Sequence, residues 1–315
     1  MLGITMIGPL TLPLEVALAI IAFLLSLLPA GLFIWLWYLR RHDRPVPITT
    51  VGLAFILGLV LVWPAFRMEE FASTAWFWVS PGTAHNFVGA ALPLQTMRDV
   101  LLPALGTFLI VATVEEGLRY ILLWLWLKYS KTVDQVFDGL VVGVAVGLGF
   151  ATLENTLYFL DLISQGSFDT LVFVFFLRFL ISTLAHISFG GLMGALLARG
   201  MFELFRPGRY LLAGFAIPWL LHGMYDLLLG IDYAVYAVLL LFPALVVLIS
   251  WTARRDFFII ARQGGRLLVQ ERAPITRQAR VMQQLFRRFE SPWNKNAPWL
   301  RERRVRYTFL RELER

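Results

Sequence analysis

The sequence predicts an all-α polytopic membrane protein with about seven transmembrane helices. Of its 315 residues, 58% are hydrophobic and only 16% are charged, and apolar runs of about 20 residues recur along the chain. Soluble domains are typically about 45–50% apolar and about 25% charged, so the composition excludes an ordinary soluble enzyme. The absence of cysteine excludes thiolate catalysis, disulfide bonds and cysteine-ligated metal.

The charges between the apolar runs predict the orientation of the chain. The expected spans are residues 14–39, 50–66, 101–127, 138–160, 171–198, 210–229 and 234–252. Lys and Arg are concentrated in the first, third and fifth connections and in the tail, which the positive-inside rule assigns to the cytoplasm. We therefore expect the N-terminus outside. It has no basic residue before the first apolar run, so we interpret it as an uncleaved span.

The C-terminal tail carries the positive charge of the chain. Residues 253–315 contain 16 Lys and Arg against 6 Asp and Glu, whereas the rest contains 12 against 15. Residues 254–271 fit either a hairpin turning at Gly264-Gly265 or a broken helix. Residues 275–289 fit a basic amphipathic helix, which suits an anionic lipid surface or a partner protein, although a solvated tail is an equal alternative. No motif indicates nucleic-acid binding.

The third span carries charged residues near its middle. Glu115, Glu116 and Arg119 lie in the apolar stretch Leu109–Lys128. A charge at membrane depth costs about 2.5–3.5 kcal/mol on insertion scales, so such residues usually face a bundle interior. Arg119 follows the two glutamates by four and three residues, within pairing reach of either. The alternative is a structural ion pair, but one cation paired with one carboxylate leaves the second carboxylate unpaired.

The fourth span has two helical faces of interest. One is a series of small residues that allows close helix packing: Gly139, Gly143, Gly147 and Ala151. The other places polar groups one turn apart: Phe150, Glu154 and Tyr158, with Asn155 beside them.

The fifth and sixth spans each carry one histidine. In the fifth span, His186 shares a face with Ser182, Gly190 and Gly194, where a neighbouring helix can approach closely. In the sixth span, Asp226 follows His222 by one turn, so the carboxylate can orient the imidazole or share a metal or water with it.

Depth in the bilayer predicts that these polar residues meet. At 1.5 Å per residue, Glu115, His186 and His222 lie ~18 Å from the cytoplasmic ends of their spans. Glu154 and Asp226 lie ~24 Å from those ends, at or slightly outside the midplane of a core ~30 Å thick. Four spans of alternating direction therefore bring two histidines and several carboxylates to one slab.

Two hydrolytic mechanisms remain open for such a cluster. Two imidazoles and a carboxylate (His186, His222 and Glu154) form the ligand set of a catalytic zinc, with a spare glutamate as general base. The same residues can work without metal, with a glutamate that deprotonates water and a histidine that stabilises the oxyanion. There is no H-E-x-x-H motif to demand zinc.

The polar set resembles the PrsW-type intramembrane proteases, which belong with the CAAX-protease and bacteriocin-processing (CPBP) superfamily of glutamate-dependent membrane peptidases. The resemblance covers residues 105–230 and rests on four ordered motifs: Glu115-Glu116-x-x-Arg119, Phe150-x-x-x-Glu154-Asn155-x-x-Tyr158, His186 and His222-x-x-x-Asp226. Arg119 departs from the Lys that is more common there, but it keeps the positive charge.

The resemblance implies a protease of the prokaryotic inner membrane that cuts a membrane-anchored protein, typically an anti-sigma factor, at its extracytoplasmic side. Glu115 and Glu116 would activate water, Glu154, His186 and His222 would complete the centre, and Asp226 would orient it. Arg119, Asn155 and Tyr158 would support it. The alternatives are a proton- or ion-coupled transporter, for which the expected internal repeats are not seen, and a non-catalytic membrane scaffold.

On this interpretation the chain divides into four parts. Residues 1–100 are two membrane helices and a long extracytoplasmic loop, within which Phe71–Val79 fits an interfacial or re-entrant segment. Residues 101–230 are a catalytic four-helix core, 231–252 the last span, and 253–315 the cytoplasmic tail.

Overall fold

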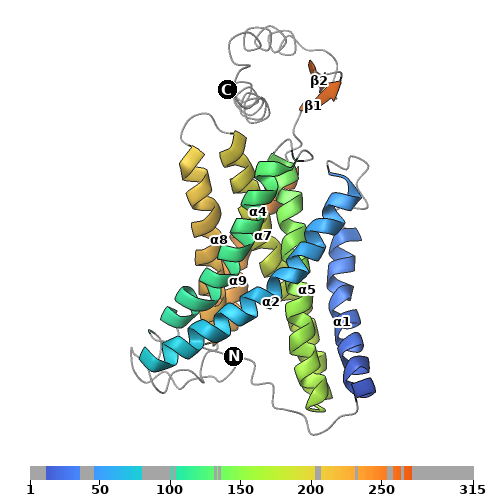
Figure 1. The fold of residues 1–315 in the computed structure, drawn as a ribbon, viewed down its shortest axis with the longest axis vertical. Helices are drawn as coiled ribbons and strands as arrows, with labels where there is room; N and C mark the ends of the chain where they lie inside the picture. The colour runs from blue at the N-terminus through green and yellow to red at the C-terminus, as the bar shows by residue number, and fades with distance from the viewer. Residues whose placement is uncertain are drawn as a thin grey trace.

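The computed structural model describes residues 12–35, 46–79, 101, 104–130, 133, 136–202, 207–230, 233–253, 258–263 and 266–271. This part of the chain is a helical bundle with a two-stranded hairpin near its C-terminal end (Figure 1). Within the described residues, five helices are long and apolar enough to cross a membrane, judged by length and composition. The all-α membrane fold is thus confirmed, whereas the count of seven spans and the orientation stay predictions.

The helices follow the apolar runs of the sequence, with changed ends. Those outside the predicted core of residues 101–230 are α1 (Leu12–Ile34), α2 (Ile48–Val79) and α9 (Ala234–Ala253). The others are η2 (Thr107–Ala112), α4 (Thr113–Tyr129), α5 (Val136–Ser164), α6 (Phe168–Leu177), η3 (Arg178–Ser182), α7 (Thr183–Phe202) and α8 (Pro207–Gly230). The two η segments are π-helical turns that continue directly into α4 and α7.

The expected end of the second span was wrong. We predicted a span over 50–66 and a loop from residue 67, but α2 continues to Val79, so the aromatic piece Phe71–Val79 is part of one long helix. The added turns contain an i,i+3 ion pair between Arg67 and Glu70, which suits a helix. Residues 80–100, the rest of the predicted loop, lie outside the described residues.

Helix α5 is the centre of the bundle and packs against α7, α2 and α1. Its small-residue face makes the predicted close contact with α7. A Cβ added at Gly143 would lie 2.1 Å from the carbonyl oxygen of Gly190, and one at Gly147 would lie 2.3 Å from that of His186. On another face of α5, a Cβ added at Gly149 would lie 2.0 Å from the carbonyl oxygen of Phe55 in α2. The glycines thus set how closely α2 and α7 approach α5.

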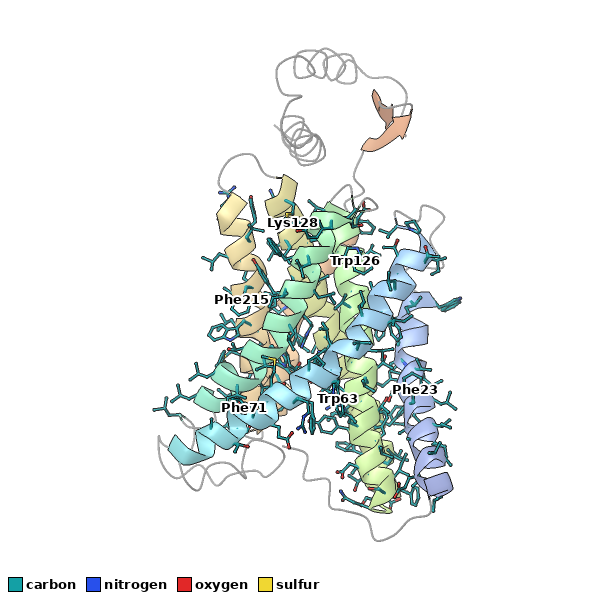
Figure 2. All side chains as sticks on the ribbon, in the orientation of Figure 1. Phe23, Trp63, Phe71, Trp126, Lys128 and Phe215 are labelled. Atoms are coloured by element: carbon teal, nitrogen blue, oxygen red, sulfur yellow. The ribbon has the colours of Figure 1, made fainter. Side chains whose placement is uncertain are left out.

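The outer surface of the bundle is apolar. Large hydrophobic side chains are exposed along the helices; Trp63 and Phe71, labelled in Figure 2, are 69% and 78% exposed on α2. Such a surface suits contact with lipid, and the few buried charges therefore gather inside the bundle.

In the tail, the hairpin alternative is confirmed. Strands β1 (Phe258–Gln263) and β2 (Arg266–Glu271) pair antiparallel around the predicted turn, with Gln263 opposite Arg266. The amphipathic helix predicted over 275–289 lies outside the described residues.

Candidate active site

The first group of buried charges is centred on Arg119 of α4. Its Nη2 atom lies 2.5 Å from Glu115 Oε2, and its Nη1 atom lies 3.0 Å from Glu116 Oε1. The guanidinium also stacks over the ring of Phe150 in α5, 4.4 Å from its centroid. One fully buried cation therefore binds both carboxylates, because the spacings of four and three residues bring both to its side of the helix.

Helix α8 adds His222 and Asp226 to this group, which we call the Arg119 cluster (Glu115, Glu116, Arg119, His222 and Asp226). The Nδ1 atom of His222 lies 2.7 Å from Glu116 Oε1. Its Nε2 atom lies 3.1 Å from Asp226 Oδ2 and 3.9 Å from Glu115 Oε2. Glu116 thus orients the imidazole, and the other ring nitrogen faces Glu115 and Asp226.

The second group, the Arg178 cluster, joins α5, η3 and α7 and consists of Glu154, Asn155, Tyr158, Arg178 and His186. His186 Nε2 lies 2.7 Å from Glu154 Oε2. Arg178 Nη2 lies 2.8 Å from Glu154 Oε1, and Arg178 Nε donates to Asn155 Oδ1 at 2.5 Å. Its guanidinium lies over the Tyr158 ring, 3.7 Å from the centroid. The three polar residues predicted on α5 therefore all contact one cation.

The two clusters form one site. The rings of His186 and His222 are edge-to-face, with centroids 5.9 Å apart, and Phe189 stacks on His222. Glu116 and Arg119 are fully buried, whereas the side chains of Glu154 and Asp226 remain 22% and 30% exposed. All nine residues predicted for the site are thus brought together, with Glu154 and Asp226 partly exposed.

A π-helical segment precedes each of two functional stretches. Thr113, the first residue after η2, donates from Oγ1 to the carbonyl of Phe108 at 2.6 Å, and Trp219 Nε1 donates to that same hydroxyl at 3.0 Å. Thr183, the first residue after η3, donates likewise to the carbonyl of Arg178 at 2.9 Å. A π turn rotates the residues that follow it relative to a regular α-helix. These turns therefore help to set the direction of Glu115 and His186, and sequence periodicity gave no sign of them.

Arg178 was missed by the sequence analysis. The signal that would have found it is a charge inside the apolar run Phe173–Ile181, at membrane depth. In the structure it neutralises Glu154 and holds Asn155, so it positions the carboxylate that contacts His186.

We expect Arg178→Met to lower the free energy of unfolding by about 1–3 kcal/mol, because it leaves Glu154 without its cation in a mostly buried place. Denaturant titration of the detergent-solubilised protein measures this. The double variant Glu154→Gln/Arg178→Met should recover part of the loss, since it removes both charges. A double variant as unstable as the sum of the single ones would contradict this pairing.

The donor atoms of the site suit zinc in type. Imidazole nitrogens and carboxylate oxygens are common zinc ligands, and His186 Nδ1 is buried without a hydrogen-bond partner among the described residues. The expected ligand set is only partly assembled: His186 contacts Glu154, but His222 faces Glu115, Glu116 and Asp226. In the described part of the chain, no three His, Asp or Glu residues come together closely enough to hold one ion.

Comparison with known proteins gives one consistent result. The family model described as "PrsW family intramembrane metalloprotease" matches residues 46–252. "Protease PrsW" of Geobacillus kaustophilus is 29% identical over 193 residues, 61% of this chain and 72% of that protein. "Protease PrsW" of Bacillus subtilis is 29% identical over 194 residues, 61% and 75% of the two chains, and that of Clostridioides difficile is 34% identical over 152 residues, 48% and 61%. No solved structure matches the chain.

Proposed function

The chain belongs to the PrsW family of intramembrane metalloproteases, and from that membership we propose that it hydrolyses a peptide bond of a membrane-anchored protein with water activated by Glu115. The membership also decides between the alternatives left open by the residues: the protein is a membrane protease and not a transporter. Its relatives are bacterial, so we place it in the bacterial inner membrane.

One observation carries the choice of Glu115. Of the two adjacent glutamates, Glu116 is fully buried and bonded to His222 Nδ1, whereas Glu115 is 7% exposed and lies across from His222 Nε2. A base must be reached by water, so Glu116 suits an orienting role and Glu115 suits proton abstraction. Arg119 fixes both carboxylates.

The proposed reaction is a simple proton cycle. Glu115 takes a proton from water, and the water oxygen attacks the carbonyl carbon of the scissile bond. The N–H of His186 Nδ1, which has no hydrogen-bond partner among the described residues, stabilises the negative oxygen that develops. The carbon–nitrogen bond then breaks, and the proton held by Glu115 passes to the leaving amine nitrogen. Glu154 and Arg178 keep His186 in place, and Asp226 orients His222.

The family description implies a metal, and the donor types of the site suit zinc. His186, His222 and Glu154 are the proposed ligands; they come from the two different clusters, so holding one ion requires His222 to move toward His186 and Glu154. A bound zinc would supply Lewis-acid activation of water and of the substrate carbonyl.

The proposed substrate is a single-span regulatory protein such as an anti-sigma factor, and residues 101–230 are the proposed catalytic core. The basic residues of 253–315 are proposed to bind an anionic lipid surface.

The test uses purified full-length protein and a single-pass test protein labelled on both sides of its span. We expect cleavage, and about one zinc per chain that is lost in His186→Ala and His222→Ala. Cleavage by chelator-treated, metal-free protein that still depends on Glu115 would instead establish metal-free activation of water. If nothing is cut with or without zinc, the proposed function is wrong.

A further inference from the structure

Glu69 of α2 is a carboxylate beside the active site that the four motifs do not include. Val62 and Ala65 of α2 pack in one hydrophobic cluster with Val114 and Phe150. Glu69 follows Val62 by seven residues and Ala65 by four, so it continues the same helical face. That face therefore contacts Val114, the residue before Glu115, and Phe150, which lies one turn before Glu154.

The charges around Glu69 agree with this placement. Its side chain interacts electrostatically with Glu115, Glu154, Asp226 and His222, which come from both clusters of the site. Phe71, two residues further along α2, is 78% exposed on the opposite side of the helix. In Figure 1, the later part of α2 lies beside α4, and the two helices are in contact. Glu69 is therefore on the inward side of α2, facing the catalytic carboxylates.

One oxygen of this carboxylate is unused. Oε1 of Glu69 is buried and has no hydrogen-bond partner among the described residues. A buried acceptor without a partner costs about 1–3 kcal/mol, and neighbouring carboxylates repel it further. Among the described residues this oxygen adds no hydrogen bond to the fold, so its burial calls for an explanation.

The chemistry of intramembrane proteolysis supplies a partner for this oxygen. A peptide bond in a helix is shielded by its neighbours, so a membrane-spanning substrate must unwind before water can attack it. Unwinding frees backbone N–H groups, and at membrane depth each unpaired N–H costs several kcal/mol. A protease that cuts there must offer acceptors to these groups, and they are present whatever the substrate sequence.

We propose that Glu69 is a substrate-binding residue whose Oε1 atom accepts a hydrogen bond from a backbone N–H of the unwound substrate segment beside the scissile bond. This inference rests on the proposed protease function and adds α2 to the elements that bind substrate. It assigns Glu69 a binding role only, so the proton cycle of Glu115 is unchanged.

The test measures binding separately from cleavage. The probe is a synthetic single-span peptide with a fluorophore and a quencher at its ends. Its KM is measured with active protein, and its Kd with the Glu115→Gln protein. We expect Glu69→Leu to raise both about tenfold to a hundredfold, because the buried N–H of the substrate is left without an acceptor. Glu69→Gln, which keeps an acceptor oxygen, should have an intermediate effect.

Glu70→Leu is the matched control. Glu70 is the adjacent residue, and it is partly exposed and paired with Arg67, so its loss should leave KM and Kd unchanged. The midpoint of thermal unfolding of Glu69→Leu should equal or exceed that of the wild type, since no internal hydrogen bond of Oε1 is removed. A lower midpoint that parallels the loss of binding would overturn the inference in favour of a structural role.

Backbone esters identify the donor. Replacing single N–H groups of the peptide by ester oxygens removes one donor at a time. One ester should weaken binding to the Glu115→Gln protein at least tenfold and leave binding to the Glu69→Leu/Glu115→Gln protein unaffected. If no ester behaves in this way, the inference is wrong.

Three further outcomes are decisive, and the first two separate this inference from the proposed function. Wild-type cleavage with normal KM and Kd in both Glu69 variants overturns the role of Glu69 alone. Peptide binding that depends on Glu69, in a wild-type protein that cuts nothing, overturns the protease function alone. Loss of zinc from Glu69→Gln without a change in peptide binding would make Glu69 a metal ligand and also overturn the inference.

Discussion

Glu115→Gln is expected to lower the rate of substrate cleavage by about 10²- to 10⁴-fold, the range that general-base catalysis contributes. The amide keeps the size of the side chain and can still accept a hydrogen bond from Arg119, but it cannot take a proton from water. The bundle should remain folded, because Glu116 still pairs with Arg119 and His222. Cleavage of a labelled single-pass substrate measures the rate, and thermal unfolding checks the fold.

Two variants make this result specific. Glu15→Gln makes the same chemical change at an exposed position in the first turn of α1, so it should cleave at the wild-type rate. Glu116→Gln should lower stability as well as rate, because Glu116 is fully buried and holds both Arg119 and His222. Wild-type cleavage by Glu115→Gln, with inactive but stable Glu116→Gln, would exchange the two assigned roles.

Gly143→Val is expected to have the largest effect on stability. A Cβ at this position would lie 2.1 Å from the carbonyl oxygen of Gly190, and the backbone of α7 cannot rotate away as a side chain can. Helices α5 and α7 would have to separate. Overpacking typically costs about 1–3 kcal/mol, and we expect the loss here to be about 3 kcal/mol or more. Since α5 carries Glu154 and α7 carries His186, activity should fall as well. Denaturant titration and the cleavage assay measure the two effects.

The comparison for Gly143 is Gly52→Ala in α2. No atom lies within 4 Å of a Cβ built at Gly52, so alanine should be tolerated and can add about 0.5–1 kcal/mol through its better helix propensity. If Gly143→Val is as stable as the wild type, then the contact between α5 and α7 is looser than the structure shows.

The contacts that the sequence predicted well lie within one helix. Arg119 reaches Glu115 and Glu116, and His222 reaches Asp226, at spacings of three and four residues. Helical geometry fixes these distances almost regardless of what surrounds the helix. The glycine face of α5 was visible for the same reason, since residues four apart share a side of the helix.

Contacts between helices depended on features with no local signal. Whether His222 contacts Glu116 or Glu154 depends on how α8 and α4 are rotated about their axes, and the π turn η2 changes that rotation for α4. The pairing of Arg178 with Glu154 likewise joins η3 to α5 across the bundle. The expected zinc ligands were assigned from residue types, and residue types do not specify which nitrogen faces which oxygen.

The sequence by itself determined the membrane class, most of the helices, the residues that meet at the site and the family of the protein. Each of these depends on composition, on local periodicity or on motifs of a few residues. Only the tertiary structure decided that α2 extends past its expected end and brings Glu69 to the site, and that two arginines divide the carboxylates between them. These results depend on the tilt and rotation of whole helices, which the packing of α5 against its neighbours sets.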